Sequence, residues 1–549
     1  MSKIIGIDFG TTNSVATYMN NRGKIEIIKD HNGDYLMPSI VSIFDGKKIF
    51  GKDAKENIEA LYKGNGVKEI KREVGKNKKV SFDGKYVETT DIIGLILNKI
   101  KGNAEEYFKE EISEAVITVP AKFSDGQRKE IIEGALKAGL KVKKTINEPT
   151  AALLEYTFNN PMNNKRVLCY DFGGGTFDIS IADITSGGIK VIAVGGDREL
   201  GGKDIDDKLF QWIKEDISSR GLALSSYGKE QLLLEVEKAK IKLSNSEKVR
   251  ISIPSLRTVH KNITFNKEIT RYQFESLIQP IINKSKNLVK KTLLEKNIQE
   301  FSIDEVLLVG GSSNIPLVKK ELESIFGNKV KKSSNIDTCV AIGAGIEAAN
   351  QMGILNQNRA KIKRDVCPFN LGLKVYNNGS DDVFDPIVFK NSPYGVEFSE
   401  EYNTALDRQT TMELEIYQGE SQWASENEHI TNLEITGIPV AAAGEEWVKI
   451  TFKYDENGII SIKSRILSTG LENIHEYKYG YDINRRVDTS IIDSNMIDTD
   501  LRIKAANTIE MLEKRGLSSI TGDIKQHLKY EQEEELEEDL EEVLVRHRL

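Results

Sequence analysis

Two hydrophobic patterns follow one another along the chain. Up to about residue 351, short apolar runs such as Ile4–Ile7, Ala115–Val119 and Val306–Val309 alternate with segments whose apolar residues recur at helical spacing. Continuous apolar runs are typical of strands that are buried on both faces, and helices between them indicate a largely parallel sheet. The first part of the chain is therefore predicted to be an α/β domain, with helices that include Gln127–Leu140 and Glu230–Leu243.

A different pattern begins after a polar and basic stretch at residues 357–364. Met412–Ile416 alternates strictly between apolar and polar residues, and two alternating runs within Val448–Ile462 flank Asp455–Gly458, whose Asn-Gly pair is a strong hairpin signal. Strict alternation is typical of antiparallel strands with one buried face. The predicted parts are a first domain at 1–356, a linker at 357–364, a β module at 365–482 and a short helical tail at 483–549.

The same short pattern occurs twice within the α/β region. Ile5–Ser14 and Leu168–Asp178 each contain an apolar strand, an aspartate, an aromatic residue, a glycine turn and a threonine. Glycines in such turns allow backbone N–H groups to converge on phosphate oxygens, and carboxylates suit Mg²⁺, which usually keeps its own waters. A single copy is about as often an ordinary strand and turn, whereas two copies predict two half-sites for one phosphate chain.

Composition and missing motifs exclude several classes of protein. The 549 residues are too many for a single core, and a net charge of −8 argues against nucleic acid as a partner. The three cysteines, Cys169, Cys339 and Cys367, are widely spaced and fit reduced thiols. With neither a signal peptide nor an apolar run of membrane length, we expect a soluble cytoplasmic protein without a membrane partner. The Walker-type loop, the zinc spacings and the G-x-S-x-G nucleophile pattern are also missing.

Two weaker features indicate a nucleotide only in combination with the paired turns. Gly310-Gly311-Ser312 follows the apolar run at 306–309, and Glu237, Lys240 and Ser244 lie on one face of a predicted helix. A strand followed by two glycines is a weak signal, and three polar residues on one helix face are more often ordinary surface. Together with the turns, they fit a pocket that is assembled from several loops.

These motifs together resemble the DnaK-type 70-kDa heat-shock chaperones, from residue 4 to about residue 470. The stretches that carry the resemblance are Gly6–Ser14, Ile70–Arg72, Val116–Ala121, Ile146–Ala152, Asp171–Asp178, Leu200–Asp204 and Val309–Ser312. Asp365–Leu373 and the modest length are most similar to the short HscC-type branch.

The resemblance implies an α/β actin-like two-lobed ATPase domain, an antiparallel β-sandwich that grips extended apolar peptides, and a short α-helical tail. ATP or ADP would lie between the lobes with Mg²⁺, and K⁺ is a second candidate cation. The implied catalytic residues are Asp8, Lys71, Glu148, Asp171 and Thr176, of which Lys71 would orient the attacking water. The implied metal residues are Asp8, Asp171 and Asp178, which would act partly through water.

The other positions that the resemblance implies form four groups. Phosphate contacts are expected from Gly10, Thr11, Thr12, Asn13, Gly173, Gly174, Gly175, Gly201 and Gly202. Adenosine contacts are expected from Glu237, Lys240, Ser244, Gly310, Gly311, Ser312, Asn314 and Asp337. A relay from the nucleotide would use Pro120 and Arg128. A peptide channel is expected at Leu373, Tyr376, Tyr402, Ala405, Met412 and Leu414, for which alternation alone favours ordinary sandwich core.

Unfolded or extended client polypeptides and a J-domain co-chaperone are the implied partners.

Four departures from the family change what the resemblance implies. Residues 361–364 read Lys-Ile-Lys-Arg where the family has leucine-like residues, which predicts weak coupling or a different docking surface, because burying unpaired charge is costly. Asn314 replaces an arginine that stacks beside adenine, so we expect weaker ATP binding. The segment between Lys71 and Pro120 is short, which leaves an exchange factor open, and the tail after Ile483 is too short for a full lid.

Three functions are compatible with these residues. The leading prediction is an ATP-dependent chaperone that hydrolyses ATP slowly and thereby switches its affinity for unfolded segments. A nucleotide-gated adaptor for one dedicated client is favoured by the altered linker and disfavoured by the presence of Lys71, Glu148 and Asp171. A small-molecule kinase on the same fold would have no need of the β module after Asp365.

Overall fold

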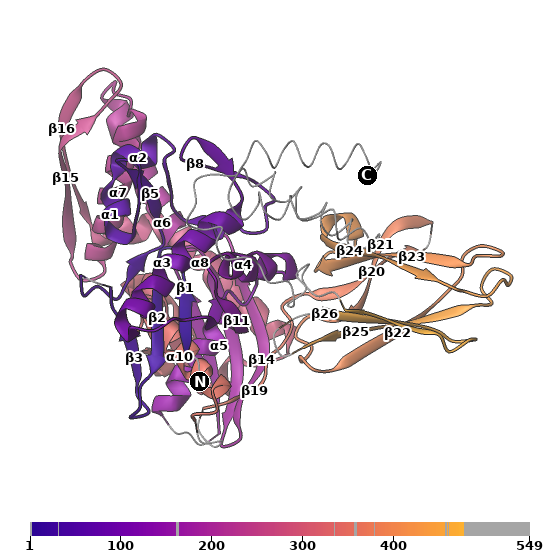
Figure 1. Cartoon of the computed structure of the whole chain (residues 1–549). Coiled ribbons are helices and arrows are strands. Elements are labelled where there is room, and N and C mark those ends of the chain that lie inside the picture. The colour runs from indigo at the N-terminus through magenta and orange to yellow at the C-terminus, as the bar shows by residue number, and fades with distance from the viewer. Residues whose placement is uncertain are drawn as a thin grey trace. The chain divides into compact units, whose positions relative to one another are not determined.

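The computed structural model describes residues 3–30, 32–160, 164–333, 335–355, 360–377, 379–455, 458 and 460–476 (Figure 1). The predicted helical tail at 483–549 lies outside the described residues. Within the described part, no helix is both long enough and apolar enough to cross a membrane.

Two sheets of matching topology form the first domain. The strands of the first sheet are β1 Ile4–Phe9, β2 Asn13–Met19, β3 Ile25–Ile28, β4 Met37–Pro38, β10 Glu114–Val119 and β11 Lys141–Asn147. Those of the second are β12 Lys165–Phe172, β13 Phe177–Thr185, β14 Gly188–Asp197, β17 Glu305–Val309, β18 Val330–Lys332 and β19 Ile362–Arg364. The order β11-β10-β1-β2-β3 of the first sheet is repeated as β18-β17-β12-β13-β14 in the second, with three parallel strands followed by two antiparallel ones in each. The glycine turns after β1 and β12 therefore occupy equivalent places in the two halves.

Helices cover both sheets and join them. The helices are α1 Gly51–Glu56, α2 Ile58–Tyr62, α3 Thr89–Phe108, α4 Asp125–Lys137, α5 Glu148–Asn159, α6 Gly202–Ser219, α7 Ser226–Leu243, α8 Arg271–Glu295, α9 Pro316–Phe326 and α10 Cys339–Gln351. Helices α5 and α10 pack on each other, and their apolar residues share one core with Val116 of the first sheet and Val167 of the second. The two halves of the α/β domain are thus held together by a common apolar core.

Short elements complete this domain. The remaining strands are β5 Val41–Phe44, β6 Lys47–Phe50, β7 Gly66–Val67, β8 Val80–Phe82, β9 Lys85–Val87, β15 Lys248–Arg257 and β16 Asn262–Thr270, and the 3-10 turns are η1 Ile70–Arg72, η2 Glu300–Ser302, η3 Gly311–Asn314 and η4 Gly327–Lys329. The β15–β16 hairpin packs beside α7 (Figure 1). The predicted strands at 4–7, 115–119 and 306–309 and both predicted helices are confirmed, with ends that differ by a few residues.

The β module is a sandwich of two four-stranded antiparallel sheets. Its elements are β20 Asn370–Asn377, β21 Ser380–Val388, β22 Glu397–Asn403, β23 Thr411–Gly419, η5 Ala424–Glu426, β24 Glu428–Thr436, β25 Trp447–Tyr454, β26 Ile460–Ile466 and β27 Glu472–Glu476. The predicted hairpin is confirmed as β25 and β26, which pair from Val448 with Ile466 to Tyr454 with Ile460. The strict alternation at 412–416 is confirmed in β23, where Met412, Leu414 and Ile416 are buried.

The linker pairs with the second sheet of the α/β domain. Strand β19 lies parallel to β14, with Ile362 opposite Ile189 and Arg364 opposite Lys190, and the backbone N–H of Ile189 donates to the carbonyl of Lys361 at 2.8 Å (Figure 1). This pairing uses main-chain groups, and the linker side chains of Ala360 and Ile362 pack on the core. The linker is thus paired with β14 through its backbone, while weak coupling to ATP stays a prediction.

Candidate functional site

The two glycine turns meet in the structure. The first turn, Gly10–Asn13, follows β1, and the second, Gly173–Thr176, follows β12. A Cβ on Gly174 would overlap the hydroxyl of Thr12, and a Cβ on Gly175 would overlap that of Thr11. Only glycine allows this approach, so the structure brings the two predicted phosphate half-sites together. The start of α6 is fixed to the second turn, because Gly202 N–H donates to the carbonyl of Gly173 at 3.0 Å.

Lys71 lies at the centre of the predicted catalytic group. Its ammonium group forms an ion pair with Glu148 and also donates to the carbonyl of Phe9. The side chains of Lys71 and Glu148 are 2% and 10% exposed, so this is a buried ion pair rather than a surface contact. An ammonium group has three N–H donors, and two are used by these partners. One donor remains for a phosphoryl oxygen or an attacking water.

Two buried aspartates, Asp171 and Asp178, and the half-buried Asp8 surround this pair and have raised pKa values. Burial, together with the charge of Glu148, raises the pKa of Asp8 to about 6 and that of Asp178 to about 7. Burial and the neighbouring carboxylates raise the pKa of Asp171 well above its usual range. Thr118 donates to Asp8 Oδ1 at 2.8 Å, and the backbone N–H of Lys122 donates to Asp178 Oδ1 at 3.2 Å. Both hydrogen bonds favour the charged carboxylates, but they lower the pKa values by less than burial raises them.

The chemistry of this cluster suits a hydrated divalent cation. Asp8, Asp171, Asp178 and Glu148 carry four carboxylates around the ammonium group of Lys71, and a dication would offset negative charge of this cluster. Among the described residues, no three His, Cys, Asp or Glu side chains lie close enough together to hold a metal ion directly. The residues therefore fit a magnesium ion that is held through its own waters.

The predicted adenosine residues lie on two sides of the second half of the α/β domain. On α7, Lys240 pairs with Asp206 of α6 at 2.7 Å and donates to the carbonyl of Gly202 at 3.2 Å, and Ser244 caps the end of this helix. On η3, the hydroxyl of Ser312 donates to the carbonyl of Gly173 at 2.9 Å. Both sides are thus bonded to the second glycine turn or to the start of α6.

The backbone at Gly310 places the phosphate and adenosine sides next to each other. Gly310 has a φ of +81°, and a Cβ there would lie 2.6 Å from Asp171 Oδ1. A Cβ on Gly311 would lie 3.3 Å from Asp337 Oδ1, and burial raises the pKa of Asp337. Asn314, which is expected to replace an arginine, accepts from the Lys332 ammonium at 3.3 Å. A lysine therefore reaches the position where the expected arginine is missing.

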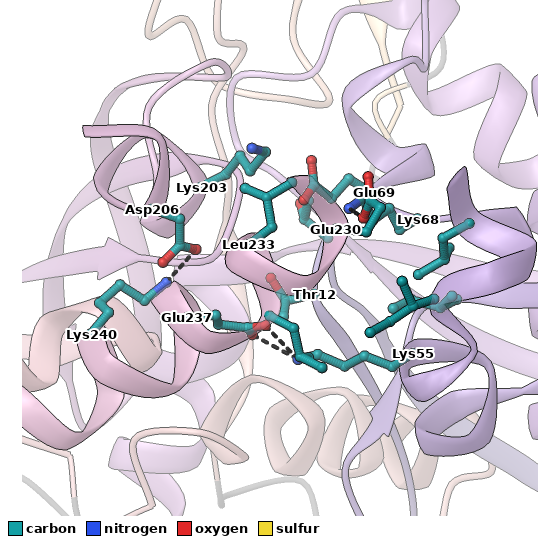
Figure 2. A pocket seen from close by; sticks show the side chains of 15 residues that line it. Thr12, Lys55, Lys68, Glu69, Lys203, Asp206, Glu230, Leu233, Glu237 and Lys240 are labelled. Carbon is teal, nitrogen blue, oxygen red and sulfur yellow. Dashed lines mark hydrogen bonds and ion pairs between the residues drawn. The ribbon is translucent and has the colours of Figure 1, made fainter. Parts of the chain in front are cut away.

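A pocket extends from Thr12 to α7 and carries charges on both walls (Figure 2). Lys55 of α1 pairs with Glu237 of α7 at 2.7 Å, and Lys68 pairs with Glu230 of α7. Glu237, one of the expected ribose ligands, is thus already bonded to the opposite wall. These two ion pairs connect the elements on either side of the pocket.

Comparisons with known proteins bear on the family of this chain. A family model described as Hsp70 protein matches residues 4–81 and 77–546. The chaperone protein DnaK of Thermosipho africanus is 36% identical over 475 residues, which cover 85% of this chain and 79% of that protein. The protein of the same name from Thermotoga petrophila is 37% identical over 476 residues, with the same coverage of 85% and 79%. The chain belongs to the Hsp70 family. Members of the Hsp70 family are ATPases that act as molecular chaperones.

The expected Hsp70 relay residues form a continuous path to the start of the sandwich. Pro120 is buried, and its carbonyl accepts from the backbone N–H of Phe123 at 3.1 Å. Arg128 donates to the side-chain carbonyl of Asn147 at 2.6 Å, and Asn147 in turn donates to Asp365 Oδ2 at 3.1 Å. The path thus ends on Asp365, directly after the linker strand.

The expected Hsp70 peptide-channel residues occupy different environments. Leu373, Met412 and Leu414 are buried in the core between the two sheets. Tyr402 packs against this core, and its hydroxyl donates to Asp385 Oδ2 at 2.8 Å. Tyr376 is 76% exposed, and Ala405 is exposed in the loop after β22. Their assignment to a channel therefore stays a prediction, and so does the likeness to the HscC-type branch.

Several site residues were missed by the sequence reasoning. These are Thr118, which contacts Asp8, Asp206, which contacts Lys240, and Lys122, which contacts Asp178. None of the three belongs to a glycine turn. Thr118 lies within Val116–Ala121, a stretch that carries part of the Hsp70 resemblance, and Lys122 directly follows this stretch, which is the signal that could have found them. Asp206 lies on the first turns of α6 and carried no signal beyond its charge.

Proposed function

We propose that this chain binds extended apolar segments of unfolded proteins and uses slow ATP hydrolysis to switch its affinity for them. The observation that carries the proposal is the buried Lys71–Glu148 pair, beside three aspartates and two touching glycine turns, in a chain that also contains a β-sandwich. A phosphate site alone would fit many ATPases. A phosphate site and a sandwich that are joined through a docked linker fit an ATP-dependent chaperone.

The residues of the α/β domain divide the chemistry between them. Thr11, Thr12 and the glycine turns would hold the phosphate chain through hydroxyl and backbone N–H groups. Lys71 would orient the attacking water and offset charge on the transferring phosphoryl group, and Glu148 would fix the ammonium group in place. The site positions water without offering a strong base, so we expect slow hydrolysis.

Asp8, Asp171 and Asp178 would hold the magnesium ion through its waters. When bound, this ion would supply positive charge at the phosphate oxygens. Asp8 and Asp178 must lose their protons to take part, and Thr118 and the backbone N–H of Lys122 favour that charged form. K⁺ stays a second candidate cation for this cluster.

The sandwich would take an extended peptide with a Leu-like side chain in a pocket near Met412 and Leu414, with Tyr376 and Ala405 at the rim.

Unfolded clients and a J-domain co-chaperone are the proposed partners, and an exchange factor stays open. Cytoplasm is the proposed location, because all three cysteines are free and buried. A nucleotide-gated adaptor for one client stays the second candidate, which the pairing of the linker with β14 disfavours.

Peptide-release kinetics with and without ATP test this function in the full chain. A fluorescent apolar heptapeptide with central leucines should bind saturably, and ATP should accelerate its release. Single-turnover ATP hydrolysis should be slow in the wild type and nearly abolished in Lys71→Ala. Equal and near-zero rates in both proteins would support the adaptor instead. A rise in ATP turnover with a small alcohol or carboxylate would support a kinase.

A further inference from the structure

Lys122 has two sets of contacts in different parts of the chain. Its backbone N–H donates to Asp178 Oδ1 at 3.2 Å, within the carboxylate cluster. Its ammonium group pairs with Glu420 Oε1 in the sandwich at 2.6 Å and donates to the carbonyl of Pro368 at 3.3 Å. The same ammonium group lies 3.9 Å from the centre of the Phe369 ring. One residue therefore touches both the nucleotide site and the β-sandwich.

Glu420 belongs to a larger network of charges. It also lies 3.3 Å from Lys390 and 3.6 Å from Lys291, and Lys390 pairs with Glu295 at 2.8 Å. Lys291 and Glu295 lie on α8, whereas Lys390 and Glu420 lie in the sandwich. The network thus holds three ammonium groups and two carboxylates contributed by both parts of the chain.

Lys122 is the most buried lysine of this network. Its side chain is 11% exposed, compared with 13% for Lys390 and 61% for Lys291. Burial, and then the charge of Lys390, lowers the pKa of Lys122 to about 8. Burial alone would raise the pKa of Glu420, but Lys122 and the other lysines lower it to about 2. The Glu420 side chain is 33% exposed, so removing Glu420 leaves the mostly buried ammonium group of Lys122 without its nearest carboxylate, whereas removing Lys122 leaves a partly exposed carboxylate.

We propose that Lys122 is a positioning residue that couples the nucleotide site to the docking of the sandwich. It holds Asp178 through its backbone and Glu420 through its side chain. A change of nucleotide that moves Asp178 moves the backbone at Lys122, separates the ammonium group from Glu420 and releases the sandwich. The inference rests on the proposed chaperone function. The Lys122–Glu420 pair would add an electrostatic contact to the docking of the linker, in which Ala360 and Ile362 pack on the core.

The sequence of the linker provides a direct measure of docking. Trypsin cleaves after lysine and arginine, and the linker contains Lys361, Lys363 and Arg364. When β19 is paired with β14, the backbone at these residues is held in a sheet and should resist cleavage. The rate at which trypsin separates the α/β domain from the sandwich therefore reports undocking, without reference to peptide or hydrolysis.

The test compares variants of the full chain in the presence of ATP. Lys122→Met should increase linker cleavage by about tenfold and remove most of the ATP-dependent acceleration of peptide release. Lys122→Arg keeps the charge and should stay within about twofold of the wild type. Lys291→Met is the matched control, because it removes an equal charge that is exposed and more distant from Glu420. It should also stay within about twofold of the wild type.

A second variant guards against a simple folding defect. Glu420→Gln removes the same ion pair from the sandwich side and should increase linker cleavage as Lys122→Met does. The double variant should be no worse than either single one, because the two residues act as a pair. Wild-type cleavage rates in both single variants, or additive effects in the double variant, would overturn the inference. Peptide release that does not respond to ATP in the wild type would count against the proposed function instead, while cleavage would still measure docking.

Discussion

Lys71 and Glu148 form an ion pair in the interior of the protein, and Lys71 also bonds the backbone of β1 at Phe9. The lysine comes from the 3-10 turn η1 and the glutamate from the first residue of α5. The pair therefore fixes two separate elements to the strand that precedes the first glycine turn.

Lys71→Ala should lower single-turnover ATP hydrolysis by about 10²-fold or more, because the positive charge at the transferring phosphoryl group is lost. ATP binding should be reduced much less, since the glycine turns and threonines are intact. Lys63→Ala is a suitable control, because Lys63 pairs with Glu59 on the surface of α2. A hydrolysis rate in Lys71→Ala equal to that of the wild type would contradict the assigned role.

The carboxylate cluster should make the stability of the nucleotide-free protein depend on pH. The pKa of Asp178 is raised from 3.8 to about 7, so the folded protein keeps a proton that the unfolded chain has released. Its favourable contribution is complete below pH 3.8 and is lost as the pH rises through about 7. The temperature of half-unfolding should therefore decrease as the pH is raised from about 5 to about 8. This decrease should be less steep in Asp178→Asn. Identical pH profiles for the two proteins would argue against a raised pKa at this carboxylate.

Gly188→Ala should weaken the docking of the linker. Gly188 has a φ of +121°, and a Cβ there would overlap the carbonyl of Lys361. The expected penalty of about 1–3 kcal/mol should appear as faster trypsin cleavage of the linker. Gly187→Ala is the matched control, because a Cβ on Gly187 would meet only Thr185 Oγ1, at 3.5 Å. Equal cleavage of both variants would show that β14 does not hold the linker.

Met412→Glu should lower the affinity for the leucine-containing heptapeptide by at least about tenfold, because a carboxylate in an apolar pocket is costly to bury. Stabilisation of the α/β domain by ATP should be unchanged. Met412→Leu, which keeps the pocket apolar, should bind normally. Unchanged calorimetric peptide affinity in Met412→Glu would remove Met412 from the channel.

Lys68→Met should accelerate the release of a fluorescent ADP analogue by about threefold, because the Lys68–Glu230 pair joins the two walls of the pocket (Figure 2). The pair is partly exposed, so added salt should reduce the difference between variant and wild type. A release rate that is the same at low and high salt in both proteins would show that the pair does not restrain the pocket.

Local patterns predicted most of the architecture. The apolar runs at 4–7 and 306–309 and the alternation at 412–416 correspond to β1, β17 and β23, because a buried strand needs that spacing whatever surrounds it. The pairing of the two glycine turns followed from their repeated pattern.

Contacts between distant segments could not be predicted in this way. The basic side chains of the linker predicted weak coupling or a different docking surface, and they could not predict that β19 pairs with β14 through backbone groups that every sequence provides. Thr118, Asp206 and Lys122 act through partners that lie 110, 34 and 298 positions away in the chain. No local spacing records such contacts, which depend on how the helices and sheets pack.

The buried cysteines make this chain convenient for labelling experiments. Cys169 and Cys339 have thiols whose pKa values are raised well above the usual range by burial, and burial raises that of Cys367 to about 12. Thiols react with maleimide dyes as thiolates, so all three native cysteines should react slowly. A single cysteine introduced on the surface would then take up most of the dye, and fluorophores could be attached without first replacing the native residues.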